Sequence, residues 1–231
     1  VEAADIDDGQ LVDIIVALSM HPNLRKIKLK GANVGRNACV SLETLLQWTA
    51  TNLHNLNLYA NNIDDEGIDA LVPALASSSL RVLDICGNPS ITIRGYRTIS
   101  SLLESPNTNL EELYLSTSSG GDEHALIFAH ALSNNKKLKT LGLYTSANAI
   151  STEGWFAFSK LLCDSSSINK TCLSNHTLQS IYSWRDVPQH ISSLLQLNRT
   201  QVISKKQIAI IKILKNHSHF EMQPFFEWDF K

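Results

Sequence analysis

A six-residue pattern, L-x-x-L-x-L, recurs along the chain at a nearly constant interval. Its copies, the last of them weaker, begin at Leu24, Leu53, Leu80, Leu110, Leu138 and Ile168. Subtracting these positions gives intervals of 29, 27, 30, 28 and 30 residues. A fixed period of about 20–50 residues is the signature of a protein that stacks copies of one structural unit. The chain is therefore predicted to be a solenoid, counted in repeats rather than in globular domains.

The rest of each repeat also follows a pattern. After the second copy come Ile68, Leu71 and Leu75, whose i, i+3, i+7 spacing places one apolar stripe on a helix. The L-x-L part alternates, as a strand does when one of its faces is buried. Each repeat is therefore predicted to be a strand, a turn and a helix. This gives an α/β fold in which parallel strands stack side by side with the helices outside.

Over residues 6–178 the pattern resembles the leucine-rich repeat family, in particular its long-repeat, ribonuclease-inhibitor-like class. The resemblance implies a horseshoe with a parallel sheet on the concave side and helices on the convex side. It also implies an asparagine in each turn that hydrogen-bonds to the loop backbone. Asn61 and Asn88 occupy this position. This asparagine ladder is expected to be interrupted at Ala32, Ser118, Ser146 and His176.

The two ends of the chain are predicted to differ from the repeats. Residues 1–23 form a partial first repeat within a repeat region that ends at 178, and residues 179–231 form a helical C-terminal cap. The cap helix is expected to turn Ile208, Ile211 and Leu214 inward. Its outer face should carry Lys205, Lys206, Lys212 and Lys215. The stretch Ser174–Leu178, followed by Leu194–Arg199 and the Phe- and Trp-rich end, also resembles the C-terminal regions of leucine-rich repeat proteins found in diatoms.

Charge and composition exclude several classes of function. Lys and Arg number 20 against 22 Asp and Glu, so the net charge of −2 provides no basic field for nucleic acid. No run reaches the roughly 18 apolar residues that a membrane-spanning helix needs. The four cysteines form no C-x-x-C pair, which favours free, mostly buried thiols over a zinc site. We expect an intracellular, cytoplasmic protein that neither binds nucleic acid nor inserts into a membrane.

Catalytic motifs are not found in the sequence. There is no G-x-S-x-G, P-loop, dinucleotide fingerprint or H-E-x-x-H. His217, His219 and Glu221 come nearest to a metal-ligand set, but we expect them to be solvated loop residues. We therefore expect a protein that is not an enzyme and that uses no cofactor and no metal.

The variable residues of each predicted strand are expected to face the concave side. They give a basic first strand, an acidic middle and three tyrosines. The predicted protein-binding residues are Lys26, Lys28, Lys30, Asn55, Asn57, Tyr59, Asp84, Glu112, Tyr114 and Tyr144. Tyrosine suits an interface because its ring buries area while its hydroxyl keeps a polar contact. An ordinary structural explanation also exists, because exposed strands favour aromatics and lysines on an edge strand prevent unwanted pairing.

The function that these features predict is that of a protein–protein interaction module or scaffold, whose partner is another protein. Two alternatives stay open. One is the recognition segment of a GTPase regulator or an immune-type sensor, roles that the resemblance implies for long-repeat members. The other is a structural subunit of a larger assembly, which the exposed edge of the first predicted strand, residues 24–29, favours.

Overall fold

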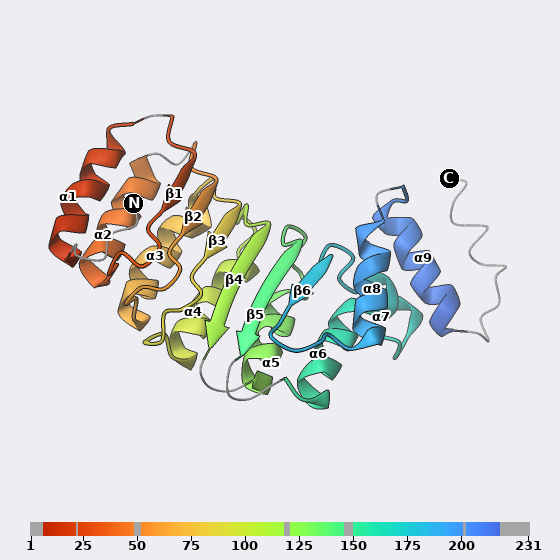
Figure 1. Ribbon diagram of the computed structural model, residues 1–231. Helices are drawn as coiled ribbons and strands as arrows, with labels where there is room; N and C mark the ends of the chain where they lie inside the picture. The colour runs from red at the N-terminus through yellow and green to blue at the C-terminus, as the bar shows by residue number, and fades with distance from the viewer. Residues whose placement is uncertain are drawn as a thin grey trace.

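The computed structural model describes residues 7–21, 23–48, 52–117, 121–145, 150–200 and 202–217. The helices in this part of the chain are α1 (Asp8–Ser19), α2 (Arg36–Trp48), α3 (Asp65–Ser77), α4 (Ile93–Glu104), α5 (Gly121–Ala131), α6 (Thr152–Leu162), α7 (Ile168–Leu173), α8 (Gln189–Arg199) and α9 (Lys205–Asn216). The strands are β1 (Lys26–Lys28), β2 (Asn55–Asn57), β3 (Val82–Asp84), β4 (Glu112–Thr117), β5 (Thr140–Thr145) and β6 (Ser180–Tyr182). Helix and strand alternate as far as α6, as the repeat pattern predicted (Figure 1).

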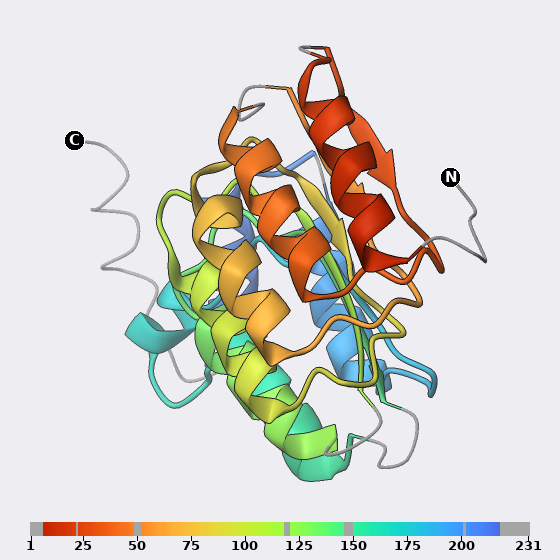
Figure 2. The ribbon, with the colours of Figure 1, turned by 90° about the vertical axis from the view of Figure 1, so that its left-hand side faces the viewer.

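The strands form one parallel sheet in the order β1-β2-β3-β4-β5-β6, so each strand lies beside its neighbours in the sequence. Helices α1 to α6 stack in the same order along one side of this sheet (Figures 1 and 2). The opposite side of the sheet, here called the open face, looks toward the viewer in Figure 1 and carries no helix over its central strands. The described residues therefore form an α/β repeat solenoid.

The core lies between the sheet and the helices. The central strand residues Leu56, Leu83 and Leu113 are buried and stand in register with one another. The stripe predicted on α3 is confirmed, since its apolar side chains are buried in the same continuous cluster. Each strand contributes the same inward positions. Each leucine position of the pattern therefore forms a buried apolar row that runs across the strands.

The asparagine of the turn has the predicted role in two repeats. The Asn61 side chain accepts hydrogen bonds from the backbone N–H groups of Ala32 and Val34 and donates to the carbonyls of Leu29 and Leu58. The Asn88 side chain donates to the Leu58 and Ile85 carbonyls and accepts from the Ile63 N–H in the preceding turn. Each buried amide therefore ties two successive turns together. The expected interruptions at Ser118 and Ser146 lie outside the described residues.

Acidic residues at the starts of the helices make two kinds of contact. Asp64 caps its own helix by accepting from the Gly67 N–H at 2.8 Å. The next residue, Asp65, instead reaches into the following repeat, where it accepts from the N–H groups of Thr92 and Gly95. Asp8 and Asp122 make equivalent contacts to the repeats that follow them. A second set of polar contacts thus joins successive helices.

The prediction for the sixth repeat was wrong. The segment beginning at Ile168 is helix α7, which Ser167 caps by accepting from the Lys170 N–H. The sixth strand is β6, in which Ile181 pairs with Leu141 of β5. Leu178 and Ile181, both buried, supply the apolar positions of this strand, whereas Leu173 is 71% exposed. The last strand therefore lies beyond the predicted end of the repeats at 178, within the residues predicted to form the helical cap.

The final helices pack as a cap, although α9 is rotated from its predicted orientation. Ile208 is buried as expected, but Leu214 is 45% exposed and Lys212, expected outside, is fully buried. The Lys212 ammonium group donates to the carbonyl of Leu162, the last residue of α6, at 2.7 Å and to the Asn198 Oδ1 at 2.8 Å. These acceptors at a helix C-terminus stabilise the cation and explain why a lysine faces inward.

Candidate protein-binding face

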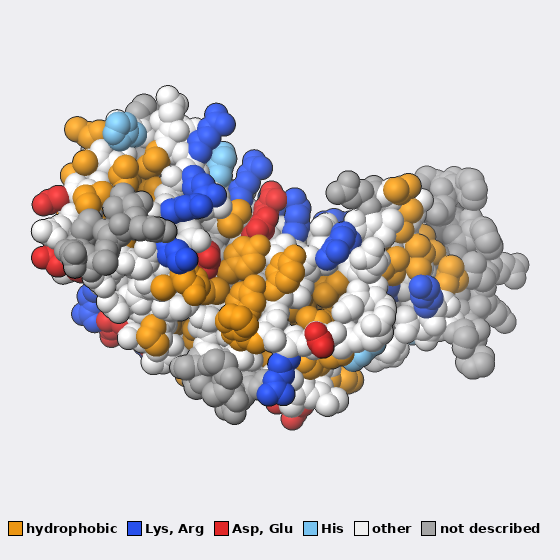
Figure 3. Space-filling model, viewed as in Figure 1, with side chains coloured by type: hydrophobic (Ala, Val, Ile, Leu, Met, Phe, Trp, Pro, Cys, Tyr) orange, Lys and Arg blue, Asp and Glu red, His pale blue; other side chains and the backbone are white. Residues whose placement is uncertain are grey.

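The predicted binding residues lie together on the open face of the sheet. They alternate with buried leucines along the strands, as the exposed–buried–exposed pattern of β1 shows. Lys26, Lys28 and Lys30 are exposed at the β1 end, so the basic end is present as predicted. Figure 3 shows blue basic side chains around one margin of this face and orange apolar side chains gathered at its centre. The sequence therefore placed these residues on the correct side of the sheet.

Contacts between neighbouring strands order the polar part of this face. Asn55 precedes Asn57 on β2, and the Asn57 Nδ2 donates to the Asp84 carboxylate on β3 at 2.8 Å. On β4 the Tyr114 hydroxyl donates to the Glu112 carboxylate, also at 2.8 Å. These bonds hold side chains that would otherwise be free to rotate, so the surface is fixed before any partner arrives.

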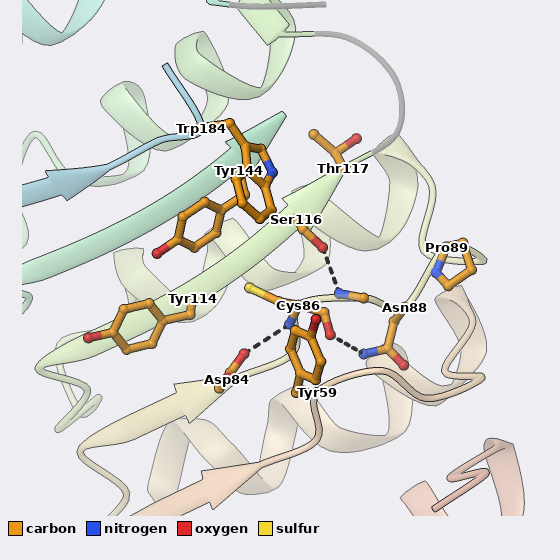
Figure 4. A pocket seen from close by; sticks show the side chains of 11 residues that line it. Tyr59, Asp84, Cys86, Asn88, Pro89, Tyr114, Ser116, Thr117, Tyr144 and Trp184 are labelled. Carbon is orange, nitrogen blue, oxygen red and sulfur yellow. Dashed lines mark hydrogen bonds between the residues drawn. The ribbon is translucent and has the colours of Figure 1, made fainter. Parts of the chain in front are cut away.

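An aromatic hollow occupies the centre of the open face. We use this name for the space of about 530 Å³ walled by Tyr59, Tyr114, Tyr144 and Trp184, with Asp84 at its base. Figure 4 shows the four rings arranged around Asp84, Cys86 and Ser116, with the Ser116 hydroxyl bonded to the backbone of the turn below. The aromatic side chains come from two strands, β4 and β5, and from the segments that follow β2 and β6. The solenoid thus brings together residues that are far apart in the sequence.

Trp184 is the functional candidate that the sequence analysis missed. Its ring centroid lies 5.2 Å from that of Tyr144, and the residue is 70% exposed. Tyr144 stands three positions after Leu141, and Trp184 stands three positions after Ile181. Placing the sixth strand at Ile168 assigned this outward-facing position of the repeat to Ser174. With the strand at its observed place, the same repeat position is occupied by Trp184.

Gly142 allows two of the rings to approach one another. It lies on β5 in register with Tyr114 of β4. A Cβ atom at this glycine would lie 2.6 Å from the Tyr114 Cδ1 and 3.0 Å from the Tyr144 Cε2. Because real Cβ contacts are longer than this, any other residue would push the rings apart. A glycine in mid-strand is therefore needed for the shape of the hollow.

Three ionisable side chains of the hollow, Tyr114, Tyr144 and Cys86, have raised pKa values that favour their neutral forms. Burial, with the neighbouring Glu112, raises the pKa of the Tyr114 hydroxyl. Burial also raises the pKa of Tyr144 and that of the Cys86 thiol, which Asp84 raises further. A thiol that stays protonated is a poor nucleophile. The chemistry available here is aromatic contact, hydrogen bonding and the charge of a carboxylate.

Possible metal ligands are dispersed in the part of the chain that the structure describes. There, no three histidine, cysteine or acidic side chains come close enough to bind a metal ion. Of the residues considered for a metal, His219 and Glu221 lie outside the described residues, and the His217 Nε2 is 2.9 Å from the Thr171 hydroxyl. None of the described helices has the length and apolar content that crossing a bilayer requires. The four cysteines are free thiols, of which Cys39 and Cys86 are buried.

Comparison with known proteins gives a partial match. No protein-family model matches the chain. The human protein named NACHT, LRR and PYD domains-containing protein 13 is 30% identical over 174 residues, which is 73% of this chain and 16% of that protein. The chain therefore corresponds to about a sixth of the length of this relative. The similarity supports leucine-rich repeats at the level of sequence.

Among solved structures, the chain overlaps with one described as Leiomodin-1 Actin-Binding Site 2. The match covers 93% of this chain and 96% of the other, at 10% sequence identity and a TM-score of 0.40. At this level of overlap the two folds are not shown to be the same.

Proposed function

We propose that the chain is a non-enzymatic protein-binding module: a leucine-rich repeat horseshoe of the ribonuclease-inhibitor-like class that binds another protein with its concave, open face. The observation that carries this proposal is the aromatic hollow. Four aromatic side chains, one of them a tryptophan that is 70% exposed, meet on a face that none of the described helices covers. Soluble proteins usually bury most of such a side chain, and tyrosine and tryptophan dominate the binding energy of protein interfaces.

The strand framework supports this role because it fixes the surface in advance. Tyr114 is held by its bond to Glu112, and Asp84 by its bonds to Asn57 and to the Cys86 N–H. Ordering a flexible side chain on binding costs about 0.5–1.5 kcal/mol. A preformed face avoids much of this cost, so a modest number of contacts can give a stable complex.

Replacing Tyr59, Tyr114 and Tyr144 together by Ala tests the proposal. The wild-type chain, the triple variant and a control, Phe156→Ala, would each be used as bait in affinity capture followed by mass spectrometry. Phe156 is a suitable control because it is 66% exposed but lies on α6, on the helical side of the sheet. Proteins recovered with wild type and the control, but lost with the triple variant, would support the proposal.

Folding has to be preserved for this comparison to be informative. The three tyrosines project from the sheet surface, so the triple variant should keep the far-ultraviolet circular dichroism spectrum of wild type. A folded triple variant that recovers the same proteins as wild type would disprove binding through this face.

A second candidate function is favoured by the match to the NACHT, LRR and PYD protein. In this case the chain would be the recognition segment of a larger immune-type sensor or GTPase regulator. Sequencing the complete gene distinguishes the two. A nucleotide-binding domain in the same polypeptide would favour the sensor, and a gene that encodes only repeats would favour the free module.

A further inference from the structure

The base of the aromatic hollow has a defined charge. Asp84 is the one charged side chain among the described residues that line it. Its Oδ1 accepts from the Cys86 N–H at 3.1 Å, and its Oδ2 accepts from the Asn57 Nδ2 at 2.8 Å. A carboxylate offers about four acceptor positions, two on each oxygen. The Cys86 thiol also hydrogen-bonds to this carboxylate, so the acceptor capacity that remains is enough for a donor from a partner.

The walls of the hollow suit a flat cation. Aromatic faces carry negative charge density and attract a cation that lies within about 6 Å of the ring centroid. The structure already contains one such contact, since the Lys30 ammonium group lies 5.0 Å from the centroid of the Tyr59 ring. Tyr144 and Trp184 add a pair of rings whose planes are tilted by 57°. Trp184, being 70% exposed, has ample ring surface left to cover an incoming group.

Taken together, the four rings and the carboxylate beneath them lead us to infer that the aromatic hollow holds an arginine side chain of the bound protein. This inference rests on the proposed function and specifies the chemistry of its anchor. The guanidinium group is planar, stacks on aromatic rings and pairs with a carboxylate through two parallel hydrogen bonds. An ammonium group lacks the planar fork and makes a single directed contact with the carboxylate.

Charges around the hollow define where this arginine can enter. Lys26, Lys28 and Lys30 repel a cation from the β1 end of the open face. Asp84 and Glu112 attract it toward the centre, where the rings stand. The partner surface should therefore place its arginine opposite β3 and β4. An acidic group on the same surface would suit the β1 end.

Titration with small probes, followed by nuclear magnetic resonance of the tryptophan indole N–H signals, tests the inference. The probes are the blocked amino acids N-acetyl-arginine methylamide, N-acetyl-lysine methylamide and N-acetyl-citrulline methylamide. Citrulline has the shape of arginine without its charge. The Trp184 signal is identified from its disappearance in the Trp184→Phe variant. The arginine probe should shift this signal to saturation, the lysine probe should bind more weakly, and the citrulline probe should leave it unchanged.

Two variants and a control connect this binding to the hollow. Asp84→Asn keeps an oxygen for the Cys86 N–H but removes the charge, and it should weaken arginine binding about tenfold. Trp184→Ala removes an exposed ring without opening the core. Because it also removes the reporting signal, its arginine binding is measured by isothermal titration calorimetry beside wild type, and it should be weaker by a similar factor. Phe156→Ala should bind like wild type. Equal binding of citrulline or lysine, or full affinity in Asp84→Asn with a native spectrum, would overturn the inference.

The inference and the proposed function fail in different ways. If capture depends on the three tyrosines but the arginine probe leaves Trp184 unchanged, the face binds a protein and the arginine anchor is wrong. If capture is also unaffected by the tyrosine changes, the proposed function is wrong as well.

Discussion

The central repeats and the closing segment of this solenoid bury polar groups in different ways. Between β1 and β4, each strand follows the last at a nearly constant interval, and the neutral amides of Asn61 and Asn88 close the turns. In the closing segment α7 is inserted before β6, and a charged lysine, Lys212, is at the centre of the polar contacts. The regular turns thus repeat one neutral amide contact, whereas the closing segment adds a buried lysine to its buried amides.

The polar cluster of the closing segment joins four elements of structure. Besides α6 and α8, the Lys212 ammonium group contacts the His176 Nδ1 at 3.0 Å and the Asn175 carbonyl at 3.4 Å. Burial lowers the pKa of Lys212 to about 8. Burial, together with the nearby cation, lowers the pKa of His176 to about 4, so this ring is neutral and can accept the bond. The cluster is therefore sensitive to pH, whereas the asparagine ladder is not.

The largest effect is expected at a turn of the regular region. Asn61→Ala removes four buried hydrogen bonds and leaves the carbonyls of Leu29 and Leu58 without that partner. At roughly 1 kcal/mol for each bond, the free energy of unfolding should fall by about 4 kcal/mol in urea titrations. Asn62→Ala, at the exposed neighbouring position, is the matched control and should change it by less than about 0.5 kcal/mol. Equal effects of the two changes would contradict this role of the ladder.

A smaller and more local effect is expected for the buried lysine. Lys212→Met keeps the length of the side chain but leaves the Leu162 carbonyl and the Asn198 Oδ1 without their donor. We expect a loss of about 3 kcal/mol, less than for Asn61 because removing a buried charge also removes its desolvation cost. Hydrogen exchange should show faster exchange in α8 and α9 and little change in α2 and α3. Lys215→Met, at an exposed position of the same helix, should leave exchange unaltered.

The smallest expected effect is a loss of folding stability at acid pH. Because the pKa of His176 falls from 6.5 to about 4 on folding, the unfolded chain binds a proton between these pH values while the folded chain does not. The contribution of His176 to the stability of the closing segment is therefore full above pH 6.5 and decreases as the pH falls toward 4, by an amount on the order of 2 kcal/mol. Comparing urea unfolding at pH 7 and pH 4.5 in wild type and in His176→Gln isolates this contribution. An identical pH dependence in the two proteins would rule it out.

Sequence reasoning succeeded where one residue type recurs in one environment. The leucines of each L-x-x-L-x-L copy from Leu53 to Leu138 are buried as predicted, because a parallel stack repeats the same inward positions. The open-face residues followed directly, since strand positions alternate between two sides. Asn61 and Asn88 were recognised for the same reason, as each turn presents the same unpaired backbone groups.

Sequence reasoning failed where the spacing between successive repeats changed. The interval from Leu138 to Leu178 is 40 residues, from the difference of their positions, so a fixed period pointed to Ile168 instead. A local signal was available, because Asn135 and Asn175 each stand three residues before a strand leucine. Both asparagines accept from the N–H of that leucine, at 2.8 and 2.9 Å. The inward turn of Lys212 could not be found in this way, because it depends on acceptors from distant elements.

Because the strands are in register, the number of strands sets the distances between side chains across the open face. Adjacent strands are about 4.8 Å apart, so each repeat between Tyr59 on the β2 side and Trp184 after β6 adds one fixed step. Inserting or deleting a whole repeat among β2, β3 and β4, whose junctions are built alike, is expected to preserve the core, yet it would change the separation of the rings by one step. Repeats that are interchangeable for folding are therefore not interchangeable for recognition, and the number of strands is itself part of the binding specificity.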